Sequence, residues 1–315
     1  MRWSTFRTAD GEERVGVWRG EALYPVPGVG RLVDLLGDDG SRLRAAGEAA
    51  VASGAGVDAA GVELLPPVPE PPSIRDFMSF EEHVVTASAA IGLTVDPLWY
   101  RQPVFYFSNP AAARGARADV RIPPGSAALD YELEVAAVIG REGSDLDPEE
   151  AERYIAGFVL FCDWSARDLQ TAEMRLNLGP AKGKDFAHSF GPWLVTRDEV
   201  APRAADRGYD LGLTASVNGV TYSRGNVAGL YWSFGQMVSY ASRGTRVRPG
   251  DVIGSGTVGT GCVLELSRVH GAETYPYLRE GDRVRLAGEL LGAIDARVLA
   301  GSPARPLSPD EEARP

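Results

Sequence analysis

Residues 129–139 read LDYELEVAAVI, and every second side chain in this stretch is apolar. This alternation predicts a β-strand at the centre of the fold. Side chains two residues apart on a β-strand point to the same face. One face of this strand is therefore apolar, and it carries Tyr131, Leu133, Val135, Ala137 and Ile139. The other face begins with Glu132 and Glu134 but continues with Ala136 and Val138.

A half-exposed strand whose glutamates meet water is the simpler interpretation of Glu132 and Glu134. Two observations weaken it. The face does not stay polar, and two carboxylates that are held side by side repel each other unless a cation neutralises them. The pair is therefore a candidate for metal binding.

Around this strand the chain is mostly strand-like, with few helices. The expected elements are an apolar strand at 157–162, a hairpin at 214–224, a helix at 230–241, and strands after Pro-Gly-Asp at 249–251 and Glu-Gly-Asp at 280–282. The hairpin is expected to turn at Asn218-Gly219, a favoured two-residue turn. Strands and helices do not alternate as they do in a parallel α/β sheet, so we predict a β-rich α+β fold.

A proline-rich run marks the first domain boundary. Five of the seven residues at 66–72 are prolines, which hold the backbone extended and exclude a helix. Before it lie strand-like runs at 3–7 and 14–18 and an alanine-rich helical stretch at 41–53, so residues 1–65 are expected to form a small α+β domain. The main domain is expected over 73–300. The tail at 301–315, rich in Pro, Glu and Arg, is expected to be disordered.

Composition excludes several classes of partner. The 315 residues carry a net charge of −11 without a basic cluster, which argues against nucleic acid or an anionic membrane as a partner. Cys162 and Cys262 lie in apolar settings, and two buried thiols are favoured over a disulfide. The N-terminus has no apolar signal core and no apolar run approaches membrane-spanning length, so a cytoplasmic protein is expected.

Asp163 follows five apolar residues and should therefore sit at the end of a strand. Capping of the next helix and a site role are equally good interpretations of this aspartate. Arg167 and Gln170 follow at positions that a helix starting at Asp163 would present along one side. Together with Glu132 and Glu134, Asp163 would suit a hard cation such as Mg²⁺, Mn²⁺ or Ca²⁺, whereas no Cys/His spacing suits zinc.

Two further stretches contribute a base and a cation. Ser79 and Glu82 predict a capping box, which would start a helix at Ser79 and place His83 in its first turn. A histidine there can act as a base, although a surface histidine is the more common finding. Lys184 lies in a glycine-flanked loop, where its ammonium is either solvated or delivered to an anionic oxygen.

The run GSGTVG at 254–259 matches a dinucleotide fingerprint only in its letters. That motif requires a following helix whose N-terminus receives the pyrophosphate. Residues 262–266, which read CVLEL, are expected to form a strand instead. We therefore interpret the run as a glycine-rich turn between two strands.

Taken in order, these stretches resemble the fumarylacetoacetate hydrolase family. The match runs through residues 76–83, 130–134, 163–170, 183–193 and 254–257. The resemblance implies a mixed β-sandwich or roll as the catalytic domain and a homodimer. It also implies a metal held by Glu132, Glu134 and Asp163; an aspartate matching Asp76 joins them in the mammalian branch but not in others.

The resemblance further implies that His83 activates water and that Arg167, Gln170 and Lys184 stabilise an oxyanion. The expected activity is hydrolysis of a C–C bond in an acylpyruvate-like or other β-dicarbonyl oxo acid. A decarboxylase, isomerase or hydratase that acts through a metal-bound enolate is the alternative.

The chain also departs from the mammalian enzyme. Met78 and Met174 replace two substrate-contacting tyrosines, and the loop after His83 lacks the matching arginine. No glutamate lies between Thr257 and Leu264, where the second catalytic acid is expected, so a non-catalytic metabolite-binding protein is a third hypothesis. His188 is expected to be structural or to lie near the site.

Overall fold

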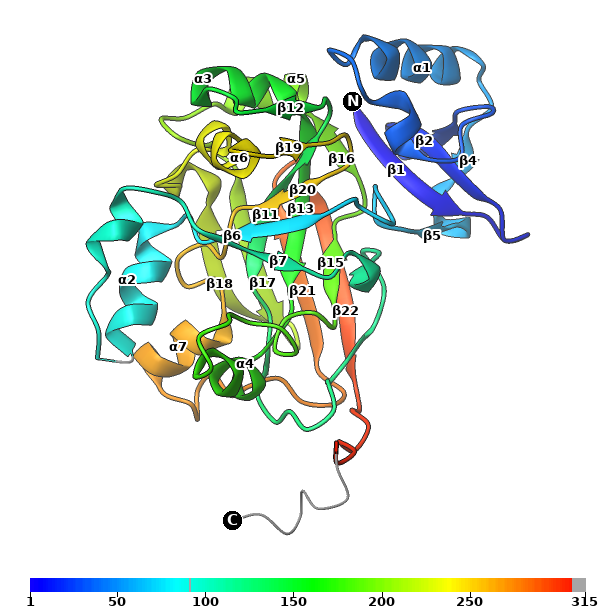
Figure 1. Ribbon diagram of the computed structural model, residues 1–315. Helices are drawn as coiled ribbons and strands as arrows, with labels where there is room; N and C mark the ends of the chain where they lie inside the picture. The colour runs from blue at the N-terminus through cyan, green and yellow to red at the C-terminus, as the bar shows by residue number, and fades with distance from the viewer. Residues whose placement is uncertain (91, 308–315) are drawn as a thin grey trace.

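The computed structural model describes residues 1–90 and 92–307 and shows a β-rich α+β fold, as predicted (Figure 1). Two sheets build the main body, and a smaller N-terminal unit lies beside it. Every helix within these residues falls short of the length and apolar character that a bilayer span requires. Of the predicted tail, residues 301–307 form no helix or strand, and 308–315 lie outside the described residues.

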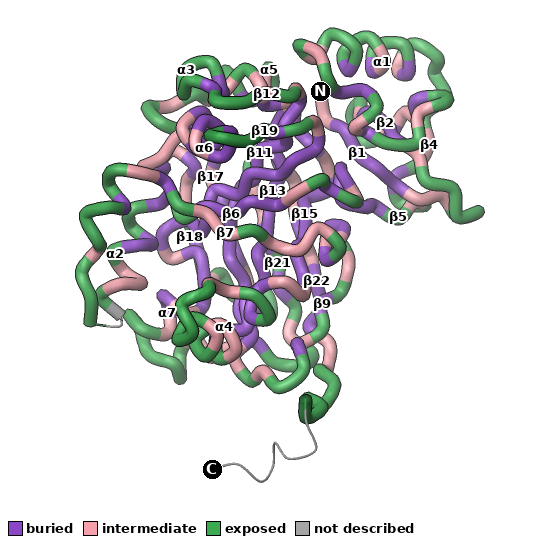
Figure 2. Tube along the Cα trace, in the orientation of Figure 1, coloured by how far each residue is buried: buried purple, intermediate pink, exposed green. Residues whose placement is uncertain are grey.

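The centre of the larger sheet follows the predicted strand. Its neighbouring strands, in spatial order, are β13 (Ile155–Asp163), β11 (Leu133–Ile139), β20 (Val252–Gly254), β6 (Ile74–Phe77) and β7 (Phe105–Ser108). The predicted apolar face of 129–139 lies in the main core, while Ala136 and Val138 pack in a second core on the other side. Both faces of β11 are therefore buried, as Figure 2 shows along its whole length.

The second sheet confirms the predicted hairpin. Its strands, in spatial order, are β18 (Val220–Asn226), β17 (Gly212–Val217), β21 (Arg283–Gly288), β22 (Gly292–Leu299) and β9 (Val120–Arg121). Asn218 and Gly219 take positive φ of 51° and 82°, which the two-residue turn requires. The predicted helix is α6 (Phe234–Ser242); it begins after Ser233, whose hydroxyl caps it together with Gln236.

The N-terminal unit is continuous with the large sheet. It consists of β1 (Arg2–Arg7), β2 (Glu13–Arg19), β3 (Ala22–Pro25), β4 (Val57–Asp58), β5 (Glu63–Leu64) and α1 (Ser41–Ala52). Strand β1 pairs with β16 (Leu194–Thr196), where Trp3 lies opposite Leu194. The prolines at 66–72 form neither helix nor strand. The division into folding units stays a prediction.

The remaining short elements complete the body. They are β8 (Ala113–Arg114), β10 (Leu129–Asp130), β12 (Gly143–Ser144), α3 (Pro148–Ala151), β14 (Ser165–Ala166), α4 (Arg167–Met174), β15 (His188–Phe190), α5 (Arg197–Val200) and β19 (Arg246–Val247). Both cysteines are buried and free, as expected.

Two predicted elements differ in the structure. Residues Val263–His270 form a helix, α7, and not the predicted strand. Helix α2 (Glu81–Ala90) places His83 in its first turn, but it begins after the predicted start. The capping box is absent because the Ser79 hydroxyl contacts the sulfur of Met237, 3.0 Å away, and does not reach a helix amide.

Candidate active site

Three buried carboxylates meet at the centre of the large sheet. Oxygens of Asp76 on β6, Glu132 beside β11 and Glu134 on β11 lie within 4.8 Å of one another. Their exposed fractions are 3%, 6% and 0%, so the interpretation of a half-exposed strand is wrong. The group includes Asp76, which the sequence favoured less strongly than Asp163.

A glycine on the intervening strand makes this meeting geometrically feasible. Strand β20 lies between β11 and β6, and Gly254 is paired with both Ala136 and Asp76. A Cβ on Gly254 would lie 2.2 Å from Oδ1 of Asp76. The first glycine of the run GSGTVG therefore leaves room for a carboxylate that reaches toward β11.

The electrostatics of the three carboxylates favour a cation. Burial raises the pKa of Asp76 and of Glu134 well above the usual range, and neighbouring carboxylates raise both further. Oδ1 of Asp76 has no hydrogen-bond partner among the described residues, whereas Glu134 accepts from the Gly256 amide at 3.1 Å. Asp76 and Glu134 form no ion pair within the described residues, so their oxygens fit a hard divalent cation, whereas Glu132 is paired with Arg167 and Lys184.

Asp163 ends strand β13 and does not start a helix; α4 begins four residues later, at Arg167. Its carboxylate accepts from the ammonium of Lys184 at 2.6 Å and from the hydroxyl of Tyr106, and it lies 3.0 Å from Nδ1 of His188. Burial alone would raise the pKa of Asp163, but Lys184 and His188 hold it below its usual value. In this arrangement the Asp163 carboxylate accepts hydrogen bonds from side chains of the protein. Its role as a metal ligand stays a prediction.

The predicted oxyanion group gathers beside the acidic cluster. Arg167 donates to Asp130 and to Glu132, both at 2.8 Å, and to the Gln170 side-chain oxygen at 3.1 Å. Lys184 also donates to Glu132 at 2.6 Å. Burial would lower the pKa of Lys184, but Asp163 and Glu132 raise it above its usual value, so the ammonium stays protonated. The three predicted residues and Glu132 line the same cavity.

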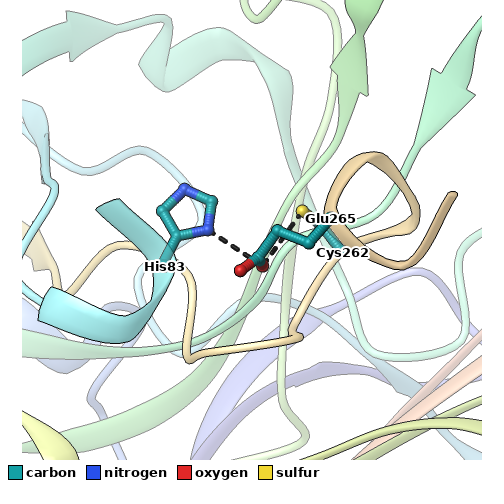
Figure 3. A group of neighbouring side chains, drawn as sticks. All are labelled: His83, Cys262 and Glu265. Atoms are coloured by element: carbon teal, nitrogen blue, oxygen red, sulfur yellow. Dashed lines mark hydrogen bonds and ion pairs between the residues drawn. The ribbon is translucent and has the colours of Figure 1, made fainter. Parts of the chain in front are cut away.

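The base candidate has an acidic partner that the sequence analysis missed. Figure 3 shows His83 and Cys262 on either side of the Glu265 carboxylate. Nδ1 of His83 lies 2.9 Å from Oε2 of Glu265, although the ring N–H is not aligned for a hydrogen bond. Glu265 is 1% exposed and lies on α7, one residue beyond the segment 257–264 in which the second catalytic acid was expected. A strand at 262–266, as predicted from the sequence, gives no reason to place this side chain beside His83.

The same three side chains could also hold a metal, since their ligand atoms lie within 4.8 Å of one another. Burial, however, raises the pKa of the Cys262 thiol well above its usual range. The thiol therefore stays protonated and donates to Glu265 at 3.4 Å. We interpret the group as a histidine–glutamate pair supported by a thiol, because the Glu265 carboxylate lies 2.9 Å from Nδ1 of His83 and accepts from the Cys262 thiol.

Asp130 and His188 contact the residues of the site without lining the cavity. Asp130 accepts from the first amides of α7, Val263 at 2.7 Å and Leu264 at 3.0 Å, and so fixes the helix that carries Glu265. These amides are therefore not available to bind a pyrophosphate. The exclusion of a dinucleotide site is retained, although residues 262–266 do not form the predicted strand. His188 is fully buried, contacts Ser108 at 2.7 Å and lies 3.0 Å from Asp163, so it is near the site; whether its role is structural stays a prediction.

A cavity of about 1130 Å³ opens over this constellation. Asp76, His83, Glu132, Arg167 and Lys184 line its floor. Its remaining lining is largely apolar, with Met78, Val104, Phe107, Met174 and Leu178 among the exposed members. The cavity is large enough for a small organic acid, and its apolar walls favour one with a hydrocarbon middle.

Over residues 73–299 the chain matches the sequence profile of the fumarylacetoacetate (FAA) hydrolase C-terminal family. It is 29% identical over 252 residues to a fumarylacetoacetase from Arabidopsis thaliana. This alignment covers 63% of this chain and 59% of the plant protein. The chain thus spans less than two thirds of that relative's length.

Two solved structures have a similar fold. A probable 2-hydroxyhepta-2,4-diene-1,7-dioate isomerase from Mycobacterium abscessus is 25% identical with a TM-score of 0.69, covering 96% of this chain and 100% of that one. A maleylpyruvate hydrolase from Sphingobium sp. SYK-6, in complex with manganese(II) and pyruvate, is 23% identical with a TM-score of 0.72, at the same coverage of 96% and 100%.

Proposed function

Since the chain belongs to the fumarylacetoacetate hydrolase family, we propose that it is a metal-dependent hydrolase that cleaves a C–C bond in an acylpyruvate-like or other β-dicarbonyl acid. The observation that carries the proposal is the His83–Glu265 pair, which shares one cavity with a cluster of buried carboxylates. A base, an anion-stabilising group and a cation-binding set are the parts that such a hydrolysis needs.

The metal would be held by Asp76, Glu132 and Glu134, with Asp163 as a further ligand if its carboxylate turns from Lys184. These are oxygen ligands, so we propose Mg²⁺, with Mn²⁺ or Ca²⁺ as alternatives. The manganese complex of the maleylpyruvate hydrolase supports this class of ion. When bound, a divalent cation would supply Lewis-acid polarisation of the two oxygens of a β-dicarbonyl acid.

The chain's own residues account for the proton and charge movements. His83 would take a proton from the attacking water, and Glu265 would orient the imidazole and stabilise the imidazolium. Arg167, Gln170 and the protonated Lys184 would donate to the oxygen that becomes negative as water adds to the carbonyl. As this oxyanion reverts to a carbonyl, the C–C bond would break and its electron pair would leave with the departing carbon, which would take the proton held by His83.

Isomerisation or decarboxylation is the second candidate, and the likeness to a dioate isomerase favours keeping it. Such reactions need the enolate-stabilising groups but no attacking water.

The hypothesis of a non-catalytic metabolite-binding protein rested on the absence of a second catalytic acid. Glu265, 2.9 Å from His83, removes that motivation.

The proposal is tested by the ultraviolet enol absorbance of a panel of acylpyruvates, with metal-stripped protein and added Mg²⁺ or Mn²⁺. We expect metal-dependent loss of absorbance with two carbon fragments as products, and no loss in Glu132→Ala. An unchanged carbon skeleton would indicate an isomerase, and released CO₂ a decarboxylase. Sedimentation of the same sample tests the homodimer, which stays part of the proposal.

A further inference from the structure

Three side chains with metal-ligating atoms meet where the first turns of two helices come together. Helix α2 carries His83 in its first turn, while Cys262 is the N-cap residue of α7 and Glu265 lies three residues further on (Figure 3). Residues three apart at the start of a helix lie near each other, so one point beside α7 is within reach of both its side chains. No local spacing reveals this set, because His83 and Cys262 are distant in the sequence.

The distances among the ligand atoms suit a single ion. Oε2 of Glu265 lies 2.9 Å from Nδ1 of His83 and 3.4 Å from Sγ of Cys262, and one ligand atom from each residue lies within 4.8 Å of the other two. Zinc binds nitrogen and oxygen at about 2.0–2.2 Å and sulfur at about 2.3 Å, so the ligand atoms around it are about 3–4 Å apart. The three side chains are therefore close to the arrangement that one zinc ion requires.

Burial and charge favour a cation among them. His83, Cys262 and Glu265 are 8%, 0% and 1% exposed. In residues 1–90 and 92–307, Nδ1 of His83 has no hydrogen-bond partner and Glu265 forms no ion pair with a lysine or an arginine. A buried carboxylate without a cationic side chain and a buried nitrogen without a partner are both costly, and one divalent cation would satisfy both.

The types of donor select the ion. Thiolate and imidazole ligands favour zinc, whereas magnesium prefers oxygen ligands. The Cys262 thiolate and the Glu265 carboxylate would together carry two negative charges, which balance the charge of Zn²⁺. Three protein ligands leave the fourth position of a tetrahedral zinc ion for water. His83 lines the cavity, which gives the ion a route from solvent.

We propose that His83, Cys262 and Glu265 form an inhibitory Zn²⁺ site, separate from the acidic cluster at the centre of the large sheet. As Zn²⁺ binds, Nδ1 of His83 donates its lone pair, and the Cys262 thiol loses its proton to solvent while the Zn–S bond forms. The Glu265 carboxylate becomes the third ligand. No electron is transferred, so removal of the ion and return of the proton restore the histidine–glutamate pair.

Zinc at this site would prevent His83 from acting as a base. In a neutral imidazole one nitrogen carries the hydrogen and the other has the free lone pair. In the pair with Glu265, Nδ1 faces the carboxylate and leaves Nε2, which Figure 3 shows on the far side of the ring, to accept a proton. With Zn²⁺ on Nδ1 the hydrogen is carried by Nε2, which then has no lone pair for the proton of a water. The inhibition rests on the proposed function, whereas zinc binding does not.

Cobalt(II) reports the site directly, because it occupies zinc sites and gives a near-ultraviolet charge-transfer band when a thiolate binds it. The full chain, saturated with Mg²⁺, is titrated with Co²⁺ and then with Zn²⁺. We expect the band to appear with Co²⁺ and to disappear as Zn²⁺ displaces it. The oxygen ligands of the acidic cluster give no such band.

Three variants identify the ligands. Cys262→Ala should abolish the band and lower Zn²⁺ affinity by at least about 100-fold, since even the loss of a group that only supports a ligand costs about 10- to 100-fold. His83→Gln should also lower the affinity by at least about 10-fold, and it provides the test if Cys262→Ala does not fold. Cys162→Ala, which removes the other buried thiol, should change neither the band nor the affinity.

A band that is absent in wild type, or that survives in Cys262→Ala, would overturn the inference. Enol absorbance at saturating Mg²⁺ tests the inhibition. Zn²⁺ should lower the wild-type rate at concentrations that leave the residual rate of Cys262→Ala unchanged, and a zinc-selective chelator should restore it. A wild-type rate that is insensitive to Zn²⁺ would refute the inhibitory role.

The band separates this inference from the proposed reaction, because it needs no substrate. If no acylpyruvate is hydrolysed but the band appears and depends on Cys262, the reaction is wrong and the zinc site stands. If acylpyruvates are hydrolysed and neither the band nor the inhibition is found, the reaction stands and the zinc site is wrong.

Discussion

At the scale of single residues, the chemistry depends on charges that the protein buries without fully neutralising. Glu265 is almost completely buried, and its contacts within the described chain are His83, the Cys262 thiol and the Thr260 amide. Asp76 and Glu134 are buried beside each other with raised pKa values. Burying an ionised carboxylate is costly unless it is paired, so function is the better explanation for both groups.

Replacing Glu265 with Gln should lower kcat by about 10²- to 10⁴-fold, because His83 loses the carboxylate that orients it and stabilises its charged form. The change keeps the size of the side chain, so folding and Mg²⁺ affinity should be unchanged. Steady-state kinetics and calorimetry measure the two effects. Glu273→Gln, at an exposed position beyond α7, is the matched control. A kcat close to that of wild type would show that Glu265 has only a structural role.

Cation binding should release protons. The raised pKa values of Asp76 and Glu134 mean that some protons remain on these carboxyls in the metal-free protein at mildly acidic pH. A cation requires the ionised forms, so its affinity should rise with pH, by about 1.4 kcal/mol per pH unit for each proton released. Calorimetry of Mg²⁺ binding in buffers of different ionisation enthalpy counts these protons. Asp76→Asn should release fewer, and an affinity independent of pH would contradict the assigned ligands.

At the scale of elements, local patterns predicted the strands but not every helix. The alternation of 129–139 and the Asn218-Gly219 turn are local signals, and both are confirmed. The helix at 263–270 begins with β-branched and apolar residues, and its cap is the Asp130 carboxylate, which is distant in the sequence. Likewise, Asp76 meets Glu134 only because β20 separates their strands with Gly254 between them, and strand order cannot be read from a local pattern.

The glycine-rich turn after β20 should be intolerant of side chains. Gly256 has a φ of +77°, and a Cβ there would lie 2.3 Å from the carbonyl oxygen of Phe77. Gly256→Ala should therefore lower the free energy of unfolding by about 2–4 kcal/mol, from backbone strain and overpacking together. It should also weaken Mg²⁺ binding, because the Gly256 amide donates to Glu134.

Denaturant unfolding measures the stability change. Gly281→Ala is the matched control, since Gly281 has a φ of +90° but nothing within 4 Å of the added Cβ. Its cost should be the backbone strain alone, about 1–2 kcal/mol. If both substitutions lowered the free energy of unfolding equally, the contact between the added Cβ at 256 and the Phe77 carbonyl oxygen would have no energetic cost.

At the scale of the whole molecule, the N-terminal unit and the main body share structure across the proline-rich run. Strand β1 extends the large sheet through β16, and one core contains Trp3 and Val15 from the first 65 residues together with Val159 and Phe161 from β13. Shared strands and a shared core usually give one cooperative unfolding unit. The acidic cluster lies in the same sheet, so loss of the N-terminal unit should affect it.

Trp3→Ala tests this coupling. Trp3 is fully buried, and truncating such a side chain costs about 3–5 kcal/mol. We expect a single unfolding transition that moves to lower denaturant concentration, with tryptophan fluorescence, circular dichroism and loss of Mg²⁺ binding changing together. Val220→Ala, at a 62% exposed position of the hairpin, should leave the transition in place. Two separate transitions, with Mg²⁺ binding retained after the first, would instead show that residues 1–65 unfold as an independent domain and that β1–β16 pairing adds little to the stability of the site.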